Sequence, residues 1–580
     1  MGICAVLEDE LLKGFRAALA DAVGEADVGG LDVQFAPTPS FEVGELGFGC
    51  FPLAKVLRRS PNDIAARLAE RIELPPPLRG ARAVGPYLNL FVDRSAFLRR
   101  LCSEIAEAGQ AYGSTREGQG LRVALEFSSP NTNKPQHLGH IRNNLVGMCL
   151  ARLLEAAGHD VVKVNLVNDR GVHICKSMLA YQRWGQGETP QSAGRKGDHL
   201  VGDYYVRFAQ AADRDPSLNA QAQRLLQRWE DGEPQTVELW KTMNRWVYEG
   251  FQETYRRLGV SFDHVYYESE TYRHGREIVL RALDAGLCRR LPDGAVEVDL
   301  SDEGLDRKIL LRRDGTSVYM TQDLGTAVRR VEELAPDALY YVVGSEQIYH
   351  FRVLFALLRR LGYAWADRCR HISYGMVYLP EGKMKSREGK VVDADDLLDE
   401  VERLSAQAVA EKHPDISGPE LERRQRQIAL GAIAFYLLNV NLEKDISFDP
   451  AASVSFEGDT GPYIQYAHTR ICGILRKASQ RETGPPEFAQ LGNDDEMALG
   501  LGLLRFPAAV RDAARTTNPA RLAGHVLELA RTFAQFYHQN PVLQAGTPGL
   551  VAARLELCRA VRAVLQRGLN LLGIEAPERM

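Results

Sequence analysis

The 580-residue sequence lacks several features that mark specialised classes of protein. Its nine cysteines are scattered and none forms a CxxC pair, which argues against a disulfide framework or a zinc ribbon and fits a reduced cytosol. It has no apolar run near the length of about 18 residues that spans a bilayer and no signal peptide. We therefore predict a cytoplasmic protein with no membrane partner. The formal net charge is -5, so any surface for nucleic acid must be local.

The length of the chain predicts several domains, and changes of pattern divide it into three parts. Residues 1–115 mix helical and strand-like stretches, which predicts a small α+β domain. The strand-like stretches are 31–35 and 87–92. Tyr87 and Asn89 lie on one face of the second stretch, and they are either part of a half-buried edge strand or a pair that stacks on and reads a base.

Residues 116–420 alternate between strand and helix patterns. Apolar, strand-length runs occur at 122–127, 161–167, 339–343 and 372–379, with a helical pattern after the first and before the last. Polar residues 184–235 interrupt the alternation and read as an insertion. We predict a Rossmann-like α/β domain with a parallel sheet of at least four strands and helices on both faces.

Residues 421–580 carry five apolar helical stripes and no strand-like alternation, which predicts an all-α bundle. The last 80 residues contain ten Arg, no Lys and five acidic residues. Scattered charge usually marks solvated helix faces, but Arg without Lys also suits contact with phosphate.

The first candidate site is the loop 128–140, which reads SSPNTNKPQHLGH. It follows a buried strand and precedes a helix, where open α/β sheets bind nucleotides. His137 and His140 flank Gly139, which lets a ligand approach the backbone, and the free N–H groups of the helix N-terminus favour an anion. Such donors could stabilise displacement at the α-phosphorus of a polyphosphate. Alone, HxGH could equally be a surface cap or half of a metal site, although no Cys or further His stands at ligand spacing, so we predict no bound metal.

Two further stretches carry chemistry. Residues 381–390 contain four cations and two glycines, which suits either a mobile loop that binds leaving pyrophosphate or an exposed charged turn. Tyr319 and Asp323 stand four apart and share a face if helical. With Glu126, Asn131 and Gln347 they could form a pocket for a guanidinium.

Together these stretches resemble class I aminoacyl-tRNA synthetases, and most closely the arginyl-tRNA synthetase family. HLGH is similar to the HIGH signature and KMKSREG to the KMSKS loop. SSPNTNKPQHLGHIRN, DGTSVYMTQD, FEGDTGPYIQYAHTR and LGIEAPERM all resemble that family. The resemblance covers essentially the whole chain.

The resemblance implies ATP-dependent ligation of L-arginine to tRNA(Arg) through an arginyl-adenylate, with Mg²⁺ accompanying ATP and no structural metal. It implies catalytic roles for His137, His140 and Lys383, to which we add Lys134 as a hypothesis of our own. The implied ATP-binding residues are His137, Gly139, His140, Gly344, Lys383 and Lys385. The implied arginine-binding residues are Glu126, Ser129, Asn131, Tyr319, Asp323 and Gln347. The implied tRNA-binding residues are Tyr87 and Asn89 in the N-terminal domain and Tyr463, Tyr466, Tyr537 and Met580 in the helical domain, where Tyr537 could instead pack between helices.

One departure from the family pattern concerns the cationic loop. Lys385 replaces the first Ser of KMSKS, and Ser386 stands where the second Lys would be. We hypothesise that Lys134 supplies the missing charge and shares the pyrophosphate with Lys383. Three alternatives remain. The chain could be a synthetase for another amino acid, lysine above all, a non-catalytic tRNA-binding paralogue, or an adenylyltransferase that never binds tRNA. Nothing in the sequence demands a dimer, and a monomer is predicted.

Overall fold

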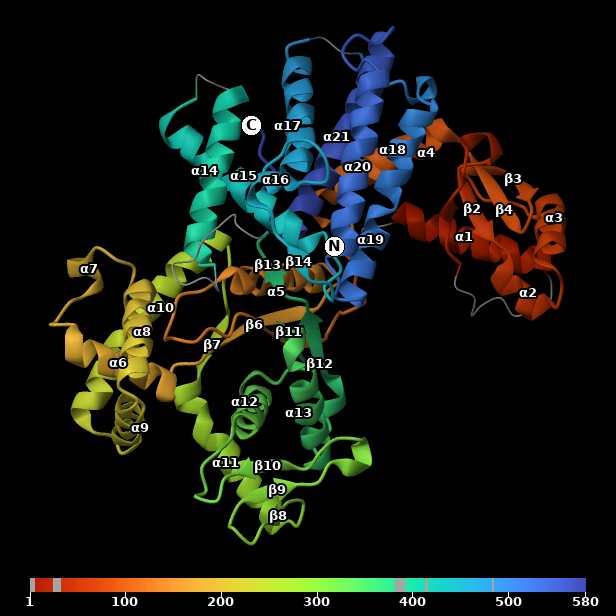
Figure 1. Cartoon of the computed structure of the whole chain (residues 1–580). Coiled ribbons are helices and arrows are strands. Elements are labelled where there is room, and N and C mark those ends of the chain that lie inside the picture. The colour runs from red at the N-terminus through yellow and green to blue at the C-terminus, as the bar shows by residue number, and fades with distance from the viewer. Residues whose placement is uncertain (1–5, 24–32, 381–391, 413–415, 482–483) are drawn as a thin grey trace. The chain divides into compact units, whose positions relative to one another are not determined.

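The computed structural model describes the chain in two compact units (Figure 1). The described residues are 6–23, 33–380, 392–412, 416–481 and 484–580. The first unit comprises Met1–Thr115, Phe456–Arg515 and Arg521–Met580, and the second comprises Arg116–Ser455 and Thr516–Ala520.

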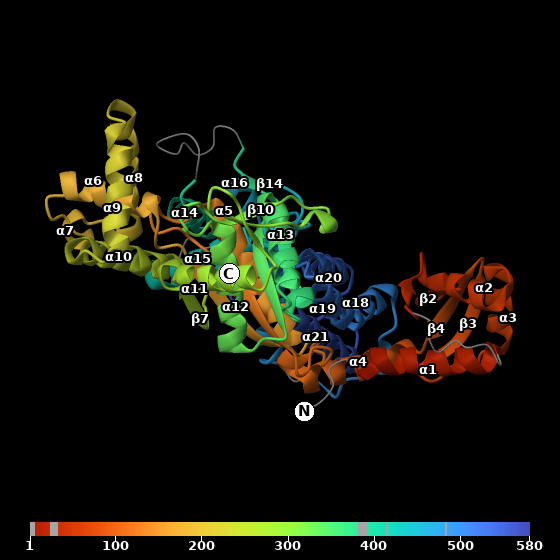
Figure 2. The ribbon, with the colours of Figure 1, turned by 90° about the horizontal axis from the view of Figure 1, so that it is seen from below.

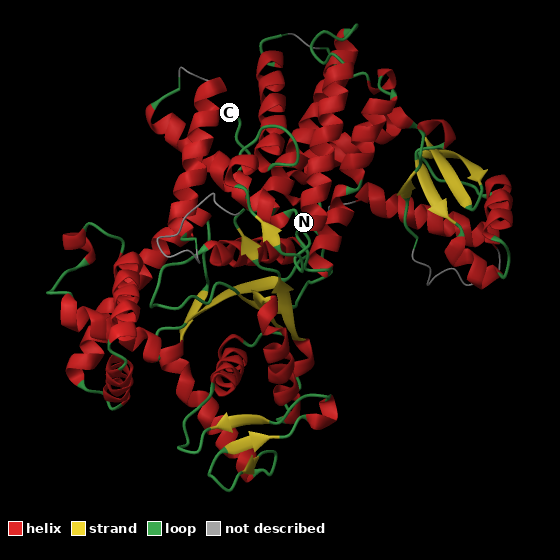
Figure 3. Ribbon diagram, in the orientation of Figure 1, coloured by secondary structure: helices red, strands yellow, loops and turns green. Residues whose placement is uncertain are grey.

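The first unit begins with a small α+β part. Its elements are α1 (Val6–Val23), β1 (Ala36–Pro37), β2 (Leu46–Gly49), α2 (Phe51–Leu57), α3 (Pro61–Arg71), β3 (Leu78–Val84), β4 (Tyr87–Val92) and α4 (Arg94–Ala108). The strands form an antiparallel sheet in the order β1-β2-β4-β3 (Figure 3). The ring of Phe15 on α1 meets Phe35 and Phe48 edge-on, at centroid distances of 5.3 and 5.2 Å.

Two strand predictions for this part need correction. Residues 33–35 are irregular, and the strand β1 begins only at Ala36. The prediction of a strand at 87–92 is confirmed as β4, but β4 pairs on both sides and is an inner strand rather than an edge strand. Leu88, Asn89, Leu90 and Val92 of β4 are buried.

The second unit is built on a parallel five-stranded sheet. Its strands are β5 (Arg122–Glu126), β6 (Asp160–Val167), β7 (His264–Tyr267), β11 (Ala338–Gly344) and β12 (Cys369–Tyr374). They lie in the order β12-β11-β5-β6-β7 and every pair is parallel. This is the doubly wound order, in which the crevice at the carboxyl ends of the first and fourth strands, here β5 and β11, is the expected ligand site.

Helices cover both faces of this sheet, as the sequence predicts. Helix α5 (Leu138–Ala156) lies on one face, and α12 (Tyr319–Leu334) and α13 (Ile348–Arg360) lie on the other (Figure 1). Buried apolar residues of α12 and α13 form one core with residues of the sheet. The sheet is therefore sealed on both sides, and its carboxyl edge is the place where side chains can meet a ligand.

The insertion is helical and longer than its polar stretch suggested. It consists of α6 (Val172–Trp184), α7 (Pro190–Ala193), α8 (Gly197–Arg214), α9 (Ser217–Glu230) and α10 (Pro234–Leu258), which gather into one group (Figure 2). A second excursion contains α11 (Glu268–Asp284) and a small antiparallel sheet of β8 (Arg289–Arg290), β9 (Val296–Val298) and β10 (Lys308–Leu311).

The second unit closes with a segment of which we expected only the part after residue 420 to belong to the helical domain. It contains β13 (Val377–Tyr378), α14 (Ala394–Lys412), α15 (Gly418–Leu438), β14 (Ile446–Ser447) and α16 (Pro450–Ser453). The predicted boundary at 420/421 falls inside α15, which packs against α14 and α5. The expectation of no strand after residue 421 is wrong at β14, because two residues are too few to show alternation.

The helical bundle belongs to the first unit. It comprises α17 (Gly461–Ala478), α18 (Asp494–Leu504), α19 (Phe506–Arg515), α20 (Ala520–Gln539) and α21 (Pro548–Leu571). The all-helical prediction is confirmed for residues 461–571 where they are described. Among the described residues, no helix is long and apolar enough to cross a membrane.

Candidate active site at the carboxyl edge of the parallel sheet

The strand β5 delivers the chain to the carboxyl edge of the sheet and then turns sharply. Ser128 and Ser129 have φ of 78° and 48°, a conformation that costs about 1–3 kcal/mol for a residue with a side chain. Asn143 accepts the N–H of Ser128 at 2.5 Å, and Asn165 accepts the N–H of Ser129 at 3.1 Å. The Ser128 hydroxyl lies 2.7 Å from that of Tyr255. These buried partners hold the strained turn in one conformation.

Asn143 also ties the turn to the fourth strand of the sheet. Its side-chain N–H₂ donates to the carbonyl of Val342 on β11 at 2.8 Å, while its oxygen holds Ser128 after β5. A single amide therefore bridges the two strands that flank the expected crevice and fixes the distance between them there.

The two histidines form the N-terminal cap of α5. His137 is the N-cap residue, and its Nδ1 accepts the N–H of Gly139 at 3.1 Å. His140 reaches back, and its Nδ1 accepts the N–H of His137 at 3.2 Å. The two ring centroids lie 4.0 Å apart. Because each Nδ1 accepts a hydrogen bond, the proton of each neutral ring is on Nε2, which can donate to a ligand.

Both imidazoles are neutral at physiological pH. Burial, reinforced by the nearby Lys134 ammonium, lowers the pKa of His137 to about 4. Burial lowers the pKa of His140 well below its usual range, and His137 and Lys134 contribute further. The positive charge at the site thus comes from Lys134 and from the N-terminus of α5, and the histidines act as neutral donors.

Two glycines lie on either side of the crevice. A Cβ at Gly139 would lie 3.0 Å from Cε1 of His137, so a side chain there would push against the capping ring. Gly344 ends β11, and a Cβ there would meet nothing within 4 Å. The open space beside Gly344 leaves room for a ligand against the end of β11. The crowding beside Gly139 favours a residue without a side chain next to the capping ring. Lys383 and Lys385 lie outside the described residues.

Three residues predicted for the arginine pocket lie at the end of β5 and in the loop that follows it. Glu126 is 7% exposed, and one carboxylate oxygen forms an ion pair with Arg330 of α12. Its other oxygen accepts the Ser129 hydroxyl at 3.3 Å. Asn131 is exposed and forms an isolated bridge with Asn168. Glu126 therefore already has a guanidinium partner within the chain, which sequence spacing did not reveal.

The other three predicted residues come from α12 and the end of β11. Tyr319 opens α12 and is 71% exposed. Asp323 lies one turn later, and its Oδ2 is 2.6 Å from Nε2 of His350 on α13. Gln347 is exposed in a short 3₁₀ turn after β11. Asp323 and Tyr319 thus share a helix face, as predicted.

A carboxylate that the sequence did not indicate lies near Asp323. Burial raises the pKa of Glu268, on α11, to about 7, with the charges of Asp169 and Asp323 adding to the shift. Arg170 lies 4.0 Å from Glu268 and opposes the shift. The negative charges gathered around Glu268 favour an arriving cation. Glu268 stands 142 residues from Glu126 in sequence, with no pattern linking them.

The predicted tRNA residues of the N-terminal part differ in exposure. Tyr87 is 44% exposed and meets the ring of Phe51 edge-on at 5.7 Å. Asn89 is only 4% exposed, and a Cβ at Gly47 would lie 3.3 Å from its Oδ1. Tyr87 is thus open to stacking, whereas β2 covers Asn89.

In the bundle, two of the predicted tyrosines share a cation. The guanidinium of Arg470 lies 4.8 Å from the ring centroid of Tyr466 and 5.4 Å from that of Tyr537. Tyr463 lies one turn before Tyr466 on α17 and is partly buried, which raises its pKa. Tyr537 is 39% exposed and Met580 is 8% exposed. Tyr537 is therefore partly exposed beside a cation, and its ring also stacks on Phe533 at a centroid distance of 6.0 Å.

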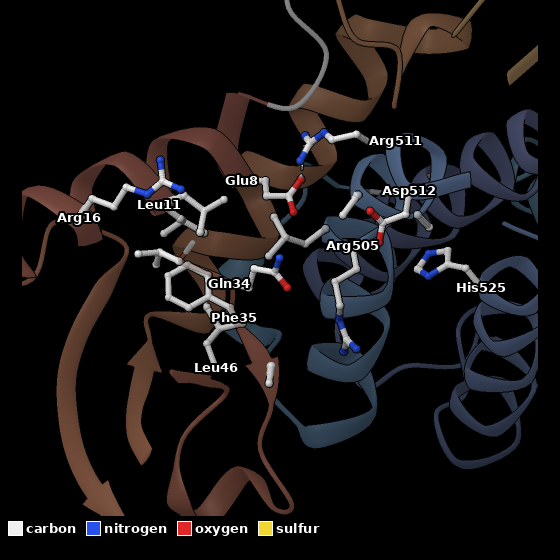
Figure 4. A pocket seen from close by; sticks show the side chains of 16 residues that line it. Glu8, Leu11, Arg16, Gln34, Phe35, Leu46, Arg505, Arg511, Asp512 and His525 are labelled. Carbon is white, nitrogen blue, oxygen red and sulfur yellow. Dashed lines mark ion pairs between the residues drawn. The ribbon is translucent and has the colours of Figure 1, made fainter. Parts of the chain in front are cut away.

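The first unit also contains a cavity of about 380 Å³, which none of the predicted site residues lines. Its polar walls include Glu8 and Arg511, which form an ion pair at 4.0 Å (Figure 4). Burial is the main cause that raises the pKa of Glu8 to about 7. This cavity belongs to a different part of the protein from the crevice of the parallel sheet.

The doubly wound sheet and the HxGH cap at its switch point define a class I aminoacyl-tRNA synthetase catalytic domain. The family model described as "tRNA synthetases class I (R), catalytic domain" matches residues 103–449. Models of the arginyl-tRNA synthetase N-terminal domain and of the DALR anticodon binding domain match residues 9–92 and 464–580. The chain belongs to the arginyl-tRNA synthetase family.

Relatives cover the whole chain. An arginine–tRNA ligase of Treponema pallidum is 44% identical over 98% of this chain and 100% of its own length. One of Bacteroides fragilis is 42% identical over 99% of this chain and 100% of its own. The solved arginyl-tRNA synthetase of Thermus thermophilus is 30% identical with a TM-score of 0.81, covering 98% of this chain and all of that one.

Proposed function

We propose that the chain ligates L-arginine to tRNA(Arg) in two steps that use ATP. The arginine carboxylate attacks the α-phosphorus of ATP, which forms arginyl-adenylate and releases pyrophosphate. A ribose hydroxyl of the terminal adenosine of tRNA then attacks the arginyl carbonyl, and AMP leaves. The observation that carries the proposal is the pair of neutral, Nε2-protonated imidazoles at the N-terminus of α5.

In the first step charge develops on the oxygens of the α-phosphate. His137 and His140 donate through Nε2, the N-terminus of α5 adds its dipole, and Lys134 supplies a full positive charge. Lys383 and Lys385 are proposed to join from the cationic loop, with Lys134 and Lys383 sharing the pyrophosphate. Mg²⁺ arrives with ATP, since this ion usually binds through phosphates and few protein groups.

Arginine is proposed to bind where β5, α12 and the end of β11 meet. Asp323 is partly exposed, and its negative charge contributes to the raised pKa of Glu268, which reflects repulsion between the two carboxylates. Binding of a guanidinium would relieve that repulsion. The proposed contacts are Glu126, Ser129, Asn131, Tyr319, Asp323 and Gln347.

The tRNA is proposed to contact both parts of the first unit. Tyr463, Tyr466, Tyr537 and Met580 are assigned to the anticodon, and Tyr87 and Asn89 to the outer corner of the tRNA. An aromatic ring beside an Arg is a favourable platform for an unstacked base, which supports the assignment of Tyr466 and Tyr537. We further propose a cytoplasmic monomer.

The test is ATP–pyrophosphate exchange with each of the twenty amino acids, with and without tRNA. We expect exchange with arginine alone, dependent on added tRNA. Exchange with lysine or another amino acid would reject the assignment of the pocket and retain the class. No exchange from a folded chain that still binds tRNA would reject the enzymatic proposal.

A further inference from the structure

The histidine loop is held from the side by the start of α14. Residues 392–394 run antiparallel to residues 136–138, with His137 opposite Asp393. The N–H of Leu138 donates to the carbonyl of Val392 at 3.0 Å, and the N–H of Ala394 donates to that of Gln136 at 3.0 Å. The backbone of the N-cap residue is therefore positioned by the first residues of another helix.

The start of α14 is in turn anchored by a partly buried lysine. The N-cap carboxylate of Asp393 accepts the N–H of Asp395 at 2.8 Å. The ammonium of Lys196, which precedes α8, lies 2.6 Å from the carboxylate of Asp395, 2.6 Å from the hydroxyl of Thr254 and 3.2 Å from the carboxylate of Asp198. An ammonium has three donors, and all three are satisfied here.

Two more nitrogen-bearing side chains of the connective helices reach the same carboxylate. Nε2 of His199 lies 3.0 Å from Asp395 and 3.7 Å from Asp393. Arg257 of α10 lies 3.5 Å from Asp395 and 2.6 Å from Asp399 of α14. Side chains of Lys196 and Asp395 are 15% and 14% exposed, so solvent screens their attraction less than that of a surface pair.

Helix α8 also touches the histidine loop directly. A Cβ at Gly202 would lie 2.8 Å from Cδ of Pro135 and 3.6 Å from Cα of Lys134. The loop is thus enclosed between α8, which contacts residues 134–135, and the start of α14, which contacts residues 136–138. The Lys196–Asp395 pair joins these two walls.

The same cluster resembles a divalent cation site. One ligand atom from each of Asp198, His199 and Asp395 lies within 4.8 Å of the others. The ammonium of Lys196, however, lies within 3.2 Å of two of these carboxylates. It already supplies the positive charge that a metal would bring, so we interpret the cluster as an ion-pair network.

We propose that Lys196 and Asp395 are positioning residues for adenylate formation, because their ion pair holds the start of α14 and thereby the place of His137. The inference rests on the proposed function. It assigns a task to the connective insertion, in which Lys196 immediately precedes α8 and α10 carries Thr254 and Arg257. A misplacement of about 1 Å can lower a rate by about 100-fold, so a loosened loop should slow the chemical step.

The experiment compares the two steps of the reaction in Asp395→Asn. Adenylate formation is measured in a single turnover with saturating ATP and arginine in the presence of tRNA. Transfer is measured separately, with synthetic arginyl-adenylate and tRNA. We expect activation to slow by about tenfold or more, with the ATP dissociation constant changed less than about twofold, and transfer to stay within about twofold of the wild type.

A second variant and a control separate positioning from folding. Thr254→Val removes one hydroxyl without removing a charge. It should also slow activation, and it keeps the proposal testable if Asp395→Asn folds poorly. Lys163→Met is the matched control, because Lys163 is 16% exposed and lies 3.2 Å from Asp263, before β7. It should lower the melting temperature without slowing activation selectively.

The outcomes distinguish a failure of the positioning role from a failure of the proposed function. An active wild type whose Asp395→Asn variant activates arginine at the normal rate overturns the positioning role. Equal losses in activation and transfer also overturn it, since they indicate a general structural defect. A wild type that forms no adenylate with any amino acid overturns the proposed function itself.

Discussion

The double use of His137 as a helix cap and as a hydrogen-bond donor allows the two contributions to be measured apart. Its Nδ1 accepts the N–H of Gly139, and its Nε2–H is free to donate. His137→Asn keeps a good N-cap, because an amide oxygen can accept the same N–H. His137→Ala removes both the cap and the donor.

The expected magnitudes follow from the two roles. Loss of an N-cap costs about 0.5–2 kcal/mol of stability, so the alanine variant should unfold more easily than the asparagine variant by about that amount. Loss of one donor to a developing oxyanion costs about 10²–10³ in rate, or about 2.7–4 kcal/mol. Both variants should therefore lose adenylate formation to a similar extent.

The assay combines urea unfolding with single-turnover adenylate formation in the presence of tRNA. Because the pKa of His137 is about 4 in the folded chain and 6.5 as its ordinary value, the folded state resists protonation. Its contribution to stability is present above pH 6.5 and decreases as the pH falls toward 4. The asparagine variant should lack this pH-dependent contribution to the free energy of unfolding. A wild-type activation rate in His137→Asn would refute the donor role.

Three further outcomes are expected. Lys134→Ala should slow adenylate formation at least tenfold, of the order of a charge-assisted contact of 1.5–3 kcal/mol, and an unchanged rate constant would exclude its share in pyrophosphate binding. Glu8→Gln should raise the free energy of unfolding at pH 8 by up to about 3 kcal/mol. The reason is that a carboxyl whose pKa rises from 4.5 to about 7 on folding destabilises the fold as the pH increases through that interval. Equal free energies of unfolding for the variant and the wild type at pH 8 would contradict this. Arg470→Ala should weaken tRNA binding and reduce its salt dependence by about one phosphate contact, measured by filter binding, and an unchanged affinity would argue that Arg470 only packs between Tyr466 and Tyr537.

The sequence predicted the parts of the site that lie on one continuous segment. The strand, turn and helix around His137 follow from local patterns, and so does the shared face of Tyr319 and Asp323. Local patterns also gave four of the five parallel strands. The four-residue β7 escaped notice because it is short and lies between two helices.

What the sequence could not show are pairings between distant segments. Arg330 meets Glu126 across 204 residues of sequence, and Lys196 meets Asp395 across 199 residues. Asn143 sits within an apolar helical stretch, where nothing signals that its amide supports a strained turn. The burial of Asn89 likewise depends on β2, which is paired from more than 40 residues away.

The reciprocal cap of α5 also has a consequence for metal ions. Two imidazoles 4.0 Å apart would ordinarily attract Zn²⁺ or Ni²⁺, which bind a bare ring nitrogen. Here each Nδ1 lone pair is occupied by a backbone N–H, and each Nε2 carries the proton. Coordination through Nε2 would move that proton to Nδ1, against an N–H, and break the hydrogen bond that caps the helix. The arrangement that prepares the site for phosphate thereby protects it from transition-metal ions.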